Sequence, residues 1–560
     1  MGLGVLDDTK LQHVPGTATL EDDIQRADAA YNGRLKHDKS GIILVPQPSD
    51  DPNDPLNWSL WRRDLILFVL SLLSVIASTL SPLLAANTLT LALHFGRTFT
   101  AVALLTGYHL LGVGIAGFIF VPSARVWGKR HLYLLGTVML IVSSAWGGAS
   151  GRNYASLLWA RIFQGVALAP FEALVNASVG DLYFVHERGK RMALSNLALF
   201  GGAFFTPVLV GKITHTIGWQ WTFYMIAIFA GALLPVVVLF VPETAFRRDD
   251  HLNTDTATTD NRRLEVGGQE LDTQGATHSQ HSSIEEPAHD ASVRHLKSDY
   301  PNSSVPAKAS FAASLLPFNG RKTDENFFKL LLRPFPLFLH PGILWACLIQ
   351  GTMIGWTVMI GIVLAAIMLG PPLWFNEVKT GYMYTGAFVG AILGFMLAGV
   401  LSDWSAKLMT RRNRGIYEPE FRLVLVLPQL LFGCAGLYGF GITSANTARY
   451  GWFWPDFFFA LEVMGMVLGA VASALYIVDA HRDLAVEAFT CLLVFKNIFS
   501  FGLTWSGYGW LVRYGIKGPF MAIASVQVVV CALTVLMYVF GKRNRSFFAR
   551  HDILRMVHLR

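Results

Sequence analysis

Long apolar runs recur through this chain and constrain its fold more than any other feature. A helix that crosses a bilayer needs about 20 mainly apolar residues, because every backbone polar group must find its partner inside the segment. Six such runs precede a polar gap and six follow it. We expect them near Leu65–Ala86, Ala101–Val121, Leu132–Ala149, Ala155–Val179, Leu194–Gly211, Thr222–Val241, Ile343–Leu369, Met383–Leu401, Leu423–Phe440, Trp452–Val478, Ala488–Leu511 and Met521–Phe540. The pattern predicts an all-α integral membrane protein with twelve transmembrane helices.

The composition excludes two other classes of protein. Hydrophobic residues make up 53% of the 560 residues and charged residues only 15%, which excludes a soluble globular protein. The net charge of +7 does not indicate nucleic-acid binding, because the basic residues form short clusters between apolar runs. Four cysteines lie within apolar stretches without metal-binding spacing and are expected to be free thiols: Cys347, Cys434, Cys491 and Cys531.

The distribution of lysine and arginine predicts the orientation in the membrane. Cytoplasmic loops of membrane proteins carry an excess of basic residues. Here alternate loops and the ends of the chain are basic, whereas the opposite loops carry scattered single charges. The clusters are Arg62 and Arg63, Arg125 to Arg130, Arg188 to Arg191, Lys407 to Arg414 and Lys542 to Arg545. Both termini and the central loop are therefore predicted in the cytoplasm, with the first membrane helix serving as the insertion signal.

Five segments follow from this pattern. We expect a soluble cytoplasmic tail (1–60), an N-terminal group of six helices (61–245), a cytoplasmic linker (246–334), a C-terminal group of six helices (335–541) and a cytoplasmic tail (542–560). Polar residues dominate the linker over 249–304, which predicts disorder. Its last part, Glu325 to Arg333, has the pattern of a short amphipathic helix on the membrane surface.

One predicted helix carries charge at membrane depth. Arg161, Gln164, Gly165 and Glu172 lie inside an apolar run, which ends in a polar turn that begins at Asp181. A charge at the bilayer centre costs at least about 2.5–3.5 kcal/mol, so it usually faces a bundle interior or a wet cavity. Arg161 and Glu172 are eleven positions apart and share one helix face. They serve either in transport or as a buried structural pair that holds helices together.

The six-plus-six pattern with a long middle loop resembles the major facilitator superfamily, whose fold is two six-helix bundles. Arg161-Ile-Phe-Gln164-Gly165 resembles the fourth-helix Arg-x-x-Gln-Gly motif of that family. Gly128-Lys129-Arg130 resembles the basic end of the turn after helix two, although its acidic member is missing. Asp403 supplies that acid in the second half. The resemblance implies that Gly128, Lys129, Arg130 and Asp403 form cytoplasmic gate loops.

Other segments resemble a fungal subgroup of the drug:proton antiporters that also contains cation and polyamine carriers. The fifth helix, with Gly201-Gly202 and Thr206-Pro207, is similar to the antiporter motif, although Thr206 replaces a glycine. Pro207 either kinks the helix as a hinge or is an ordinary packing kink. Arg414 to Arg422 and Tyr476 to Asp483 are more specific to this subgroup. The resemblance implies a twelve-helix proton antiporter of fungal origin.

The second half has its own charges within the membrane. Glu462 lies in the predicted helix ten, and Lys496 and Asn497 lie in helix eleven. Opposite charges at similar depth would lower the insertion cost by pairing. Glu462 and Lys496 are therefore expected to form an ion pair that is either a static link between helices or a gate. Aromatic and polar residues of helices two, seven and eight are candidates for a substrate cavity, with packing as the alternative role: Tyr108, His109, Gln350, Trp356, Tyr382 and Tyr384. Glu462, Lys496 and Asn497 are further candidates for this cavity.

The sequence thus predicts a secondary transporter that works by alternating access, and not an enzyme. We expect export of a small amphipathic organic compound in exchange for protons, with Glu172 as the main coupling residue since burial favours its neutral form. Uptake of an organic cation such as a polyamine, and a non-transporting membrane sensor, are the alternatives. A monomer in the plasma membrane, or in the vacuolar membrane, is expected. The expected energy source is the proton gradient, with no cofactor; an ATP-driven pump is disfavoured because no phosphate-binding loop is present.

Overall fold

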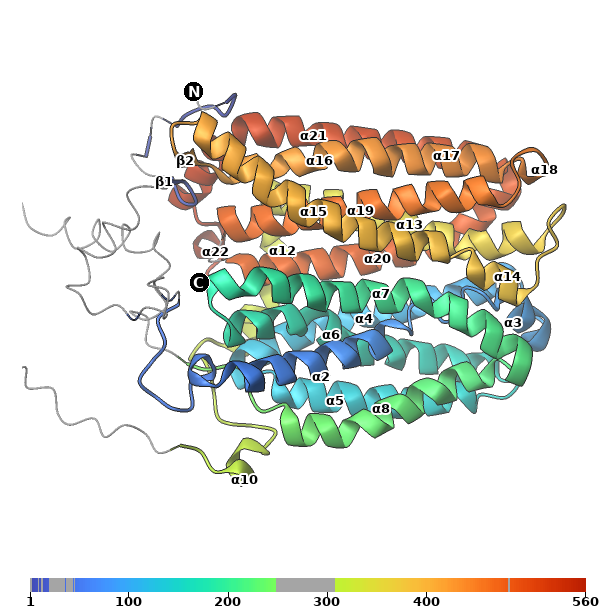
Figure 1. The fold of residues 1–560 in the computed structure, drawn as a ribbon, viewed down its shortest axis with the longest axis horizontal. Coiled ribbons are helices and arrows are strands. Elements are labelled where there is room, and N and C mark those ends of the chain that lie inside the picture. Colours follow the sequence, from blue (N-terminus) through green and yellow to red (C-terminus); the bar gives the residue numbers. More distant parts are fainter. Residues whose placement is uncertain are drawn as a thin grey trace, which may run out of the picture.

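The computed structural model describes residues 3–8, 10–11, 14–19, 36, 44, 46–247, 308–481 and 484–559. Within these ranges nearly all regular structure is helical, and the predicted all-α membrane architecture is confirmed. Two layers of long helices run side by side (Figure 1), and we call them the first and second halves. The predicted disordered stretch 249–304 lies outside the described residues.

The first half follows a short 3-10 turn and contains six long helices and one short one. Their bounds are η1 (Pro55–Asn57), α2 (Leu60–Ser78), α3 (Thr88–Phe95), α4 (Phe99–Trp127), α5 (Arg130–Gly148), α6 (Tyr154–Leu182), α7 (Val185–Ile217) and α8 (Gln220–Phe240).

Short helices connect the two halves, and the second half mixes long helices with turns. The connection contains α10 (Phe311–Ser314), α11 (Phe327–Leu332) and α12 (Pro334–Leu337). The second half contains α13 (Pro341–Leu369), α14 (Glu377–Tyr382), α15 (Thr385–Arg412), a 3-10 helix η3 (Pro419–Leu425), α16 (Val426–Pro428), a π-helix η4 (Gln429–Cys434), α17 (Ala435–Ser444), α18 (Thr447–Tyr450), α19 (Phe453–Ala480), α20 (Ala485–Tyr514), α21 (Lys517–Arg550) and α22 (Ile553–Met556).

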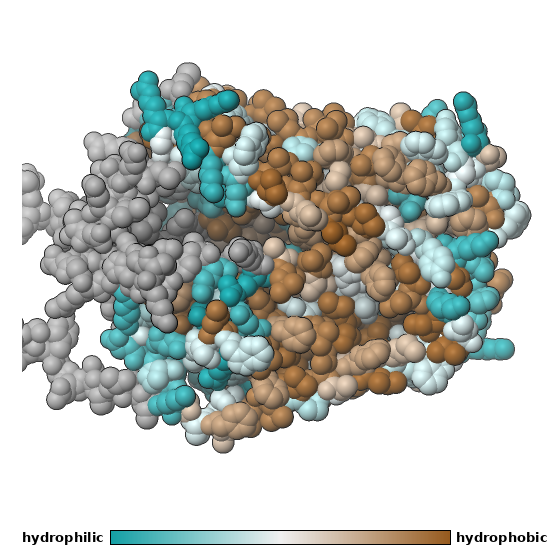
Figure 2. Space-filling model, viewed as in Figure 1, coloured by the Kyte–Doolittle hydropathy of each residue, from teal (hydrophilic) through white to brown (hydrophobic). Residues whose placement is uncertain are grey.

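Both chain termini lie at the same end of the molecule, on the left of Figure 1. We call this the terminal end. A two-residue antiparallel pair lies there, in which β1 (Ala18–Thr19) pairs with β2 (Ile416–Tyr417). The opposite end, which we call the far end, carries α3, α14 and α18. Figure 2 shows apolar residues over the middle of the visible surface and polar residues toward both ends. That distribution fits helices that lie across a bilayer.

Apolar side chains form a separate core in each half, and α7 and α20 join them. One large buried cluster lies among α2 to α8, and two others fill the second half. Phe200 and Phe204 of α7 pack against the cluster of the second half, whereas Leu493 of α20 belongs to the cluster of the first half. Glycines allow this close approach, since a Cβ on Gly107 or Gly117 of α4 would collide with side chains of α20.

Two of the predicted spans differ from the structure. Among the described residues, eleven helices are long and apolar enough to cross a membrane, and α2 is the twelfth long helix. Its first five residues include Arg62, Arg63 and Asp64, and it ends at Ser78 instead of reaching Ala86. The span predicted over Leu423–Phe440 is a composite of η3, α16, η4 and α17. Pro428 lacks the N–H that a continuous α-helix needs at this point.

The predicted amphipathic helix of the linker is shorter than expected. The structure has α11 between Asn326, whose side chain caps it, and Arg333. Pro334 then begins α12 directly.

Candidate functional site: a central cavity between the halves

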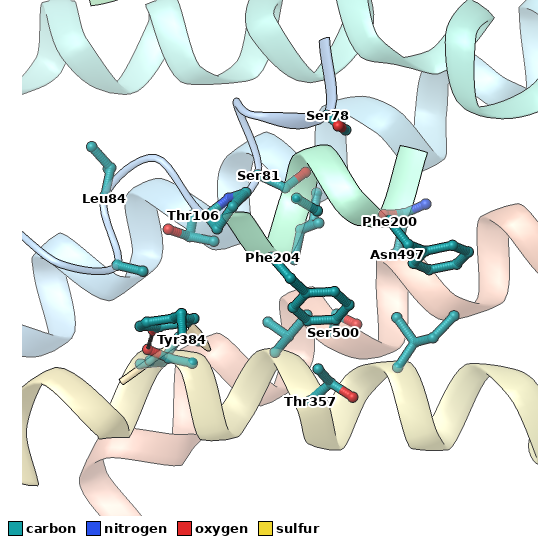
Figure 3. Close-up of a pocket in the computed structure, with 18 of the residues that line it drawn as sticks. Ser78, Ser81, Leu84, Thr106, Phe200, Phe204, Thr357, Tyr384, Asn497 and Ser500 are labelled. Atoms are coloured by element: carbon teal, nitrogen blue, oxygen red, sulfur yellow. Dashed lines mark hydrogen bonds between the residues drawn. The ribbon is translucent and has the colours of Figure 1, made fainter. Parts of the chain in front are cut away.

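A cavity of about 180 Å³ lies between the two halves. The first half contributes side chains of α2, α4, α6, α7 and the loop 79–87, and the second half those of α13, α19 and α20. Figure 3 shows lining side chains from both halves, among them Phe204 of α7, Thr357 of α13 and Tyr384, around one space. Most of the lining is apolar. The polar lining residues are Ser78, Ser81, Thr88, Thr106, Glu172, Thr357, Tyr384, Lys496, Asn497 and Ser500.

An ion pair joins the two halves at the wall of this cavity. The Lys496 ammonium of α20 donates to the Glu172 carboxylate of α6. The two side chains are only 10% and 14% exposed. Removing two charges from water costs several kcal/mol per ion, and their close contact offsets that cost. Any movement that separates α6 from α20 must therefore break this pair or neutralise it.

The structure corrects the expected pairing of Glu462 with Lys496. Glu462 is buried in α19 and accepts a hydrogen bond of 2.8 Å from the hydroxyl of Thr357. Its second oxygen has no hydrogen-bond partner among the described residues. Lys496 turns away from it to Glu172 because α20 packs against α4 and lies next to the first half.

Arg161 and Gln164 form a buried packing centre and do not reach the cavity. The guanidinium of Arg161 donates to the carbonyl oxygens of Leu80 (2.7 Å) and Leu105 (3.3 Å) and to Oε1 of Gln164 (2.9 Å). Gln164 donates to the carbonyl oxygen of Ser143. Arg161 thus holds the chain where it leaves α2, and the suggested pairing of Arg161 with Glu172 is wrong.

Gly165 completes this packing centre. A Cβ at Gly165 would lie 2.0 Å from the carbonyl oxygen of His109, so α4 and α6 can touch only with glycine here. The three residues of the Arg-x-x-Gln-Gly motif hold α2, α4, α5 and α6 together beside the cavity.

Some predicted cavity residues line the cavity and others do not. Tyr384, Lys496 and Asn497 line it, as does the predicted coupling residue Glu172, and the hydroxyl of Tyr384 donates to the carbonyl oxygen of Gly361. Six other candidates are absent from the lining, Glu462 of α19 among them. Tyr108 packs on Phe501, His109 contacts Ser81, Gln350 accepts from Ser473, Trp356 donates to Gln527, and Tyr382 is exposed near the far end.

The predicted gate loop of the first half is organised by an acid that sequence analysis did not assign. Glu243 accepts the backbone N–H groups of Lys129 (2.9 Å) and Arg130 (3.0 Å). Gly128 has a φ of +91°, and a Cβ there would collide with the Glu243 carboxylate. Lys129 forms an ion pair of 2.6 Å with Asp181. Asp403, in contrast, is exposed near the end of α15.

A ring of four alternating charges connects both halves and the linker at the terminal end. Arg125 of α4 contacts Glu487 of α20 (2.5 Å) and Glu325 of the linker (3.1 Å). Arg333 contacts the same two acids, at 3.2 Å and 2.7 Å. Arg125 stands near the position where the family motif has an acid, and here Glu487 provides the acid from the other half. The ring holds α4 and α20 together between the cavity and the terminal end.

At the far end, α7 and α14 close the opposite side. A Cβ on Gly381 would lie 2.4 Å from the carbonyl oxygen of Pro207, and one on Gly211 would lie 2.4 Å from that of Glu377. Thr90 of α3 donates to Glu377 (2.7 Å). The cavity thus lies between two zones of contact, one at each end. Pro207 belongs to the far zone, and its role at a kink or hinge stays a prediction.

Several lining residues were not predicted from the sequence. Ser500 lies one helical turn after Lys496 and donates to its carbonyl oxygen, so the polar face of α20 could have been recognised by its i, i+4 spacing. Thr357 is one of three polar residues in the otherwise apolar α13, with Gln350 and Thr352, and was not singled out. Phe200 and Phe204 line the cavity because α7 contacts the second half, which no local pattern reveals.

Comparison with known proteins places the chain among membrane carriers. The model of the Major Facilitator Superfamily matches residues 66–499. "Protein HOL1" of Saccharomyces cerevisiae is 26% identical, over 98% of this chain and 98% of that protein. "MFS transporter cpaT" of Aspergillus oryzae is 24% identical, over 88% of this chain and 90% of that one.

The solved structures show the same fold at low identity. The proton:xylose symporter XylE with bound 6-bromo-6-deoxy-D-glucose superposes with a TM-score of 0.56 and 13% identity, covering 86% of this chain and 97% of that one. A partially occluded, inward-open form of XylE from E. coli gives a TM-score of 0.51 and 11% identity, covering 85% and 98%.

Proposed function

Because this chain belongs to the major facilitator superfamily, we propose that it is a proton-coupled carrier that exports a small amphipathic organic compound. Transport as such follows from the family and from the fold, which are those of fungal MFS transporters and not of enzymes. The substrate, the coupling to protons and the direction belong to the proposal. One observation carries it: the Glu172–Lys496 ion pair joins the two halves at the wall of a largely apolar cavity.

The lining of the cavity supports an amphipathic substrate. Apolar side chains such as Phe200, Phe204 and Leu168 offer contact area, and hydroxyl groups of Thr106, Ser500 and other residues offer a few hydrogen bonds. Sites of this type bury most of a small organic ligand and orient it with few polar groups. A highly hydroxylated sugar would find too few partners here.

The ion pair supports coupling to protons. A proton on Glu172 removes the negative charge, so Lys496 loses its partner and the link between α6 and α20 weakens. Glu462 is a second group suited to hold a proton, since an ionised carboxylate there would have no cation in contact among the described residues. XylE, which has the same fold, is a proton:xylose symporter, and this likeness supports the proposal of proton coupling.

The two zones of contact support a mechanism of alternating access. We infer that the terminal end faces the cytoplasm, because the basic clusters of the loops and tails gather there. Separation of Arg125 from Glu487 would open the cavity to that side, and separation of α7 from α14 would open it to the other.

Uptake of an organic cation is the second candidate, and the acids near the cavity favour it. Glu172 and Glu462 provide two carboxyl groups in this region, against the single ammonium of Lys496. A cationic substrate could replace Lys496 at Glu172.

Transport into reconstituted vesicles tests the proposal. The purified protein, in vesicles sorted by accessibility of the C-terminal tail, would receive labelled amphipathic compounds with an imposed pH gradient of either sign. Export by proton exchange predicts accumulation of substrate in the compartment that begins acidic. Accumulation in the opposite compartment, or only of organic cations, would favour the second candidate.

A further inference from the structure

We propose that residues 3–19 are the resident ligand of a binding socket on the second half, and that this socket retains the segment without a covalent link. We define the socket by β2, η3 and the end of α21. The first sixty residues are expected from sequence to be a soluble tail, but the described part of 3–19 lies against the second half. The chain is therefore bound to the second half before it enters α2 of the first half.

Backbone and apolar contacts seat the segment. β1 pairs with β2 in antiparallel register, with Ala18 opposite Tyr417. The N–H of Leu6 donates to the carbonyl oxygen of Val539 (3.0 Å), and the hydroxyl of Tyr538 donates to that of Leu3 (2.9 Å). Val5 and Val14 are almost fully buried, although they belong to a stretch with little apolar sequence.

A buried arginine forms the centre of the socket. Arg545 has a side chain only 1% exposed and contacts Glu418 and Glu420, each at 2.8 Å. The same guanidinium donates to the carbonyl oxygen of Pro15, and the hydroxyl of Thr17 donates to Glu418 (2.8 Å). The segment thus supplies partners to charges that are out of contact with water.

Charge complementarity continues along α21. Lys542 bridges Asp7 (3.3 Å) of the segment and Glu418 (2.7 Å) of the socket. The hydroxyl of Ser546 donates to Asp8 (2.5 Å). The hydrogen bond from Ser546 lowers the pKa of the Asp8 carboxyl.

The socket explains the two segments that sequence analysis singled out without a role. Tyr417 and Arg422, from the first, both donate to Asp479, from the second. Arg422 also donates to the carbonyl oxygen of Ser402 (3.0 Å), so it fixes β2 and η3 against α15 and α19. Ordering of these segments places Glu418 and Glu420 beside Arg545.

A substitution at Gly16 tests the contact between the segment and the socket. It has a φ of +88°, which favours glycine, and a Cβ there would lie 2.7 Å from the carbonyl oxygen of Asp479. Gly16→Ala should therefore lift the segment from the socket without changing any socket residue. Lys10 is exposed, so Lys10→Ala is the matched control.

The test uses the full chain with a protease site inserted between residues 20 and 35. After cleavage of the folded protein in detergent, the N-terminal fragment should remain with the membrane domain through size-exclusion chromatography in the parent and in Lys10→Ala. In Gly16→Ala it should dissociate at least about tenfold faster. Loss of the fragment from the parent as fast as from Gly16→Ala would overturn the proposal, as would equal retention by both. The result does not depend on transport, so it stands apart from the proposed function.

Discussion

Breaking the ion pair between Glu172 and Lys496 should destabilise the protein more than removing both charges together. Glu172→Gln leaves the ammonium of Lys496 without its carboxylate partner, and Lys496→Met leaves the carboxylate of Glu172 without its ammonium partner. Removing one partner of a buried pair costs about 3–5 kcal/mol, and we expect about 3 kcal/mol because both side chains keep some exposure at the cavity wall. That is roughly a hundredfold loss in the ratio of folded to unfolded protein.

The double variant Glu172→Gln/Lys496→Met supplies the decisive comparison. Replacing both charges with neutral groups of similar size should leave stability within about 1 kcal/mol of the parent. Reversible unfolding in mixed micelles measures all four proteins, and the cycle should give a coupling of at least about 2 kcal/mol. A double variant as unstable as the sum of the two single variants would refute the pairing.

Three further predictions follow from other contacts. Arg161→Lys should lower the folded yield as severely as Arg161→Ala, because one ammonium cannot reach the carbonyl oxygens of Leu80 and Leu105 together; the exposed Arg152→Ala is the control, and rescue by lysine would contradict this role. Arg125→Ala should open the terminal end, so a cysteine placed at Asn497 should react faster with a thiol reagent. Unchanged labelling would show that the ring of charges does not act as a gate. Burial lowers the pKa of His340, outside the membrane-spanning segments, from 6.5 to about 4. As the pH falls, His340 is therefore protonated in the unfolded chain before it is protonated in the folded protein. The contribution of neutral His340 to the free energy of unfolding is full above about pH 6.5 and falls as the pH drops toward 4. His340→Asn should lose about 1.4 kcal/mol less than the parent between about pH 7.5 and pH 5.5, measured by unfolding; an equal loss in both would place the acid sensitivity elsewhere.

The fold was predictable from sequence because it depends on local properties. Apolar length alone located the long helices, and the basic clusters separate one end from the other. The errors fall where tertiary contacts override the local pattern. α2 ends at Ser78, and just beyond it the carbonyl oxygen of Leu80 accepts from Arg161, a contact that spans 81 residues.

The site was only partly predictable for the same reason. The sequence identified Glu172, Glu462 and Lys496 as unusual, since charge at membrane depth is rare. It could not pair them, because Glu172 and Lys496 are 324 residues apart and meet only through the packing of α4, α6 and α20. Aromatic residues such as Trp356 and Tyr108 were ambiguous, because packing and cavity lining require the same residue types.

Simultaneous measurement of proton and substrate flux tests the central claim most directly. Vesicles that hold a pH-sensitive dye and the reconstituted protein would receive a labelled amphipathic substrate without an imposed gradient. We predict that substrate entry drives protons out, so the lumen becomes more alkaline, and that Glu172→Gln abolishes the proton movement while substrate exchange continues. Substrate entry that acidifies the lumen, or moves no protons in the parent protein, would contradict proton-coupled export.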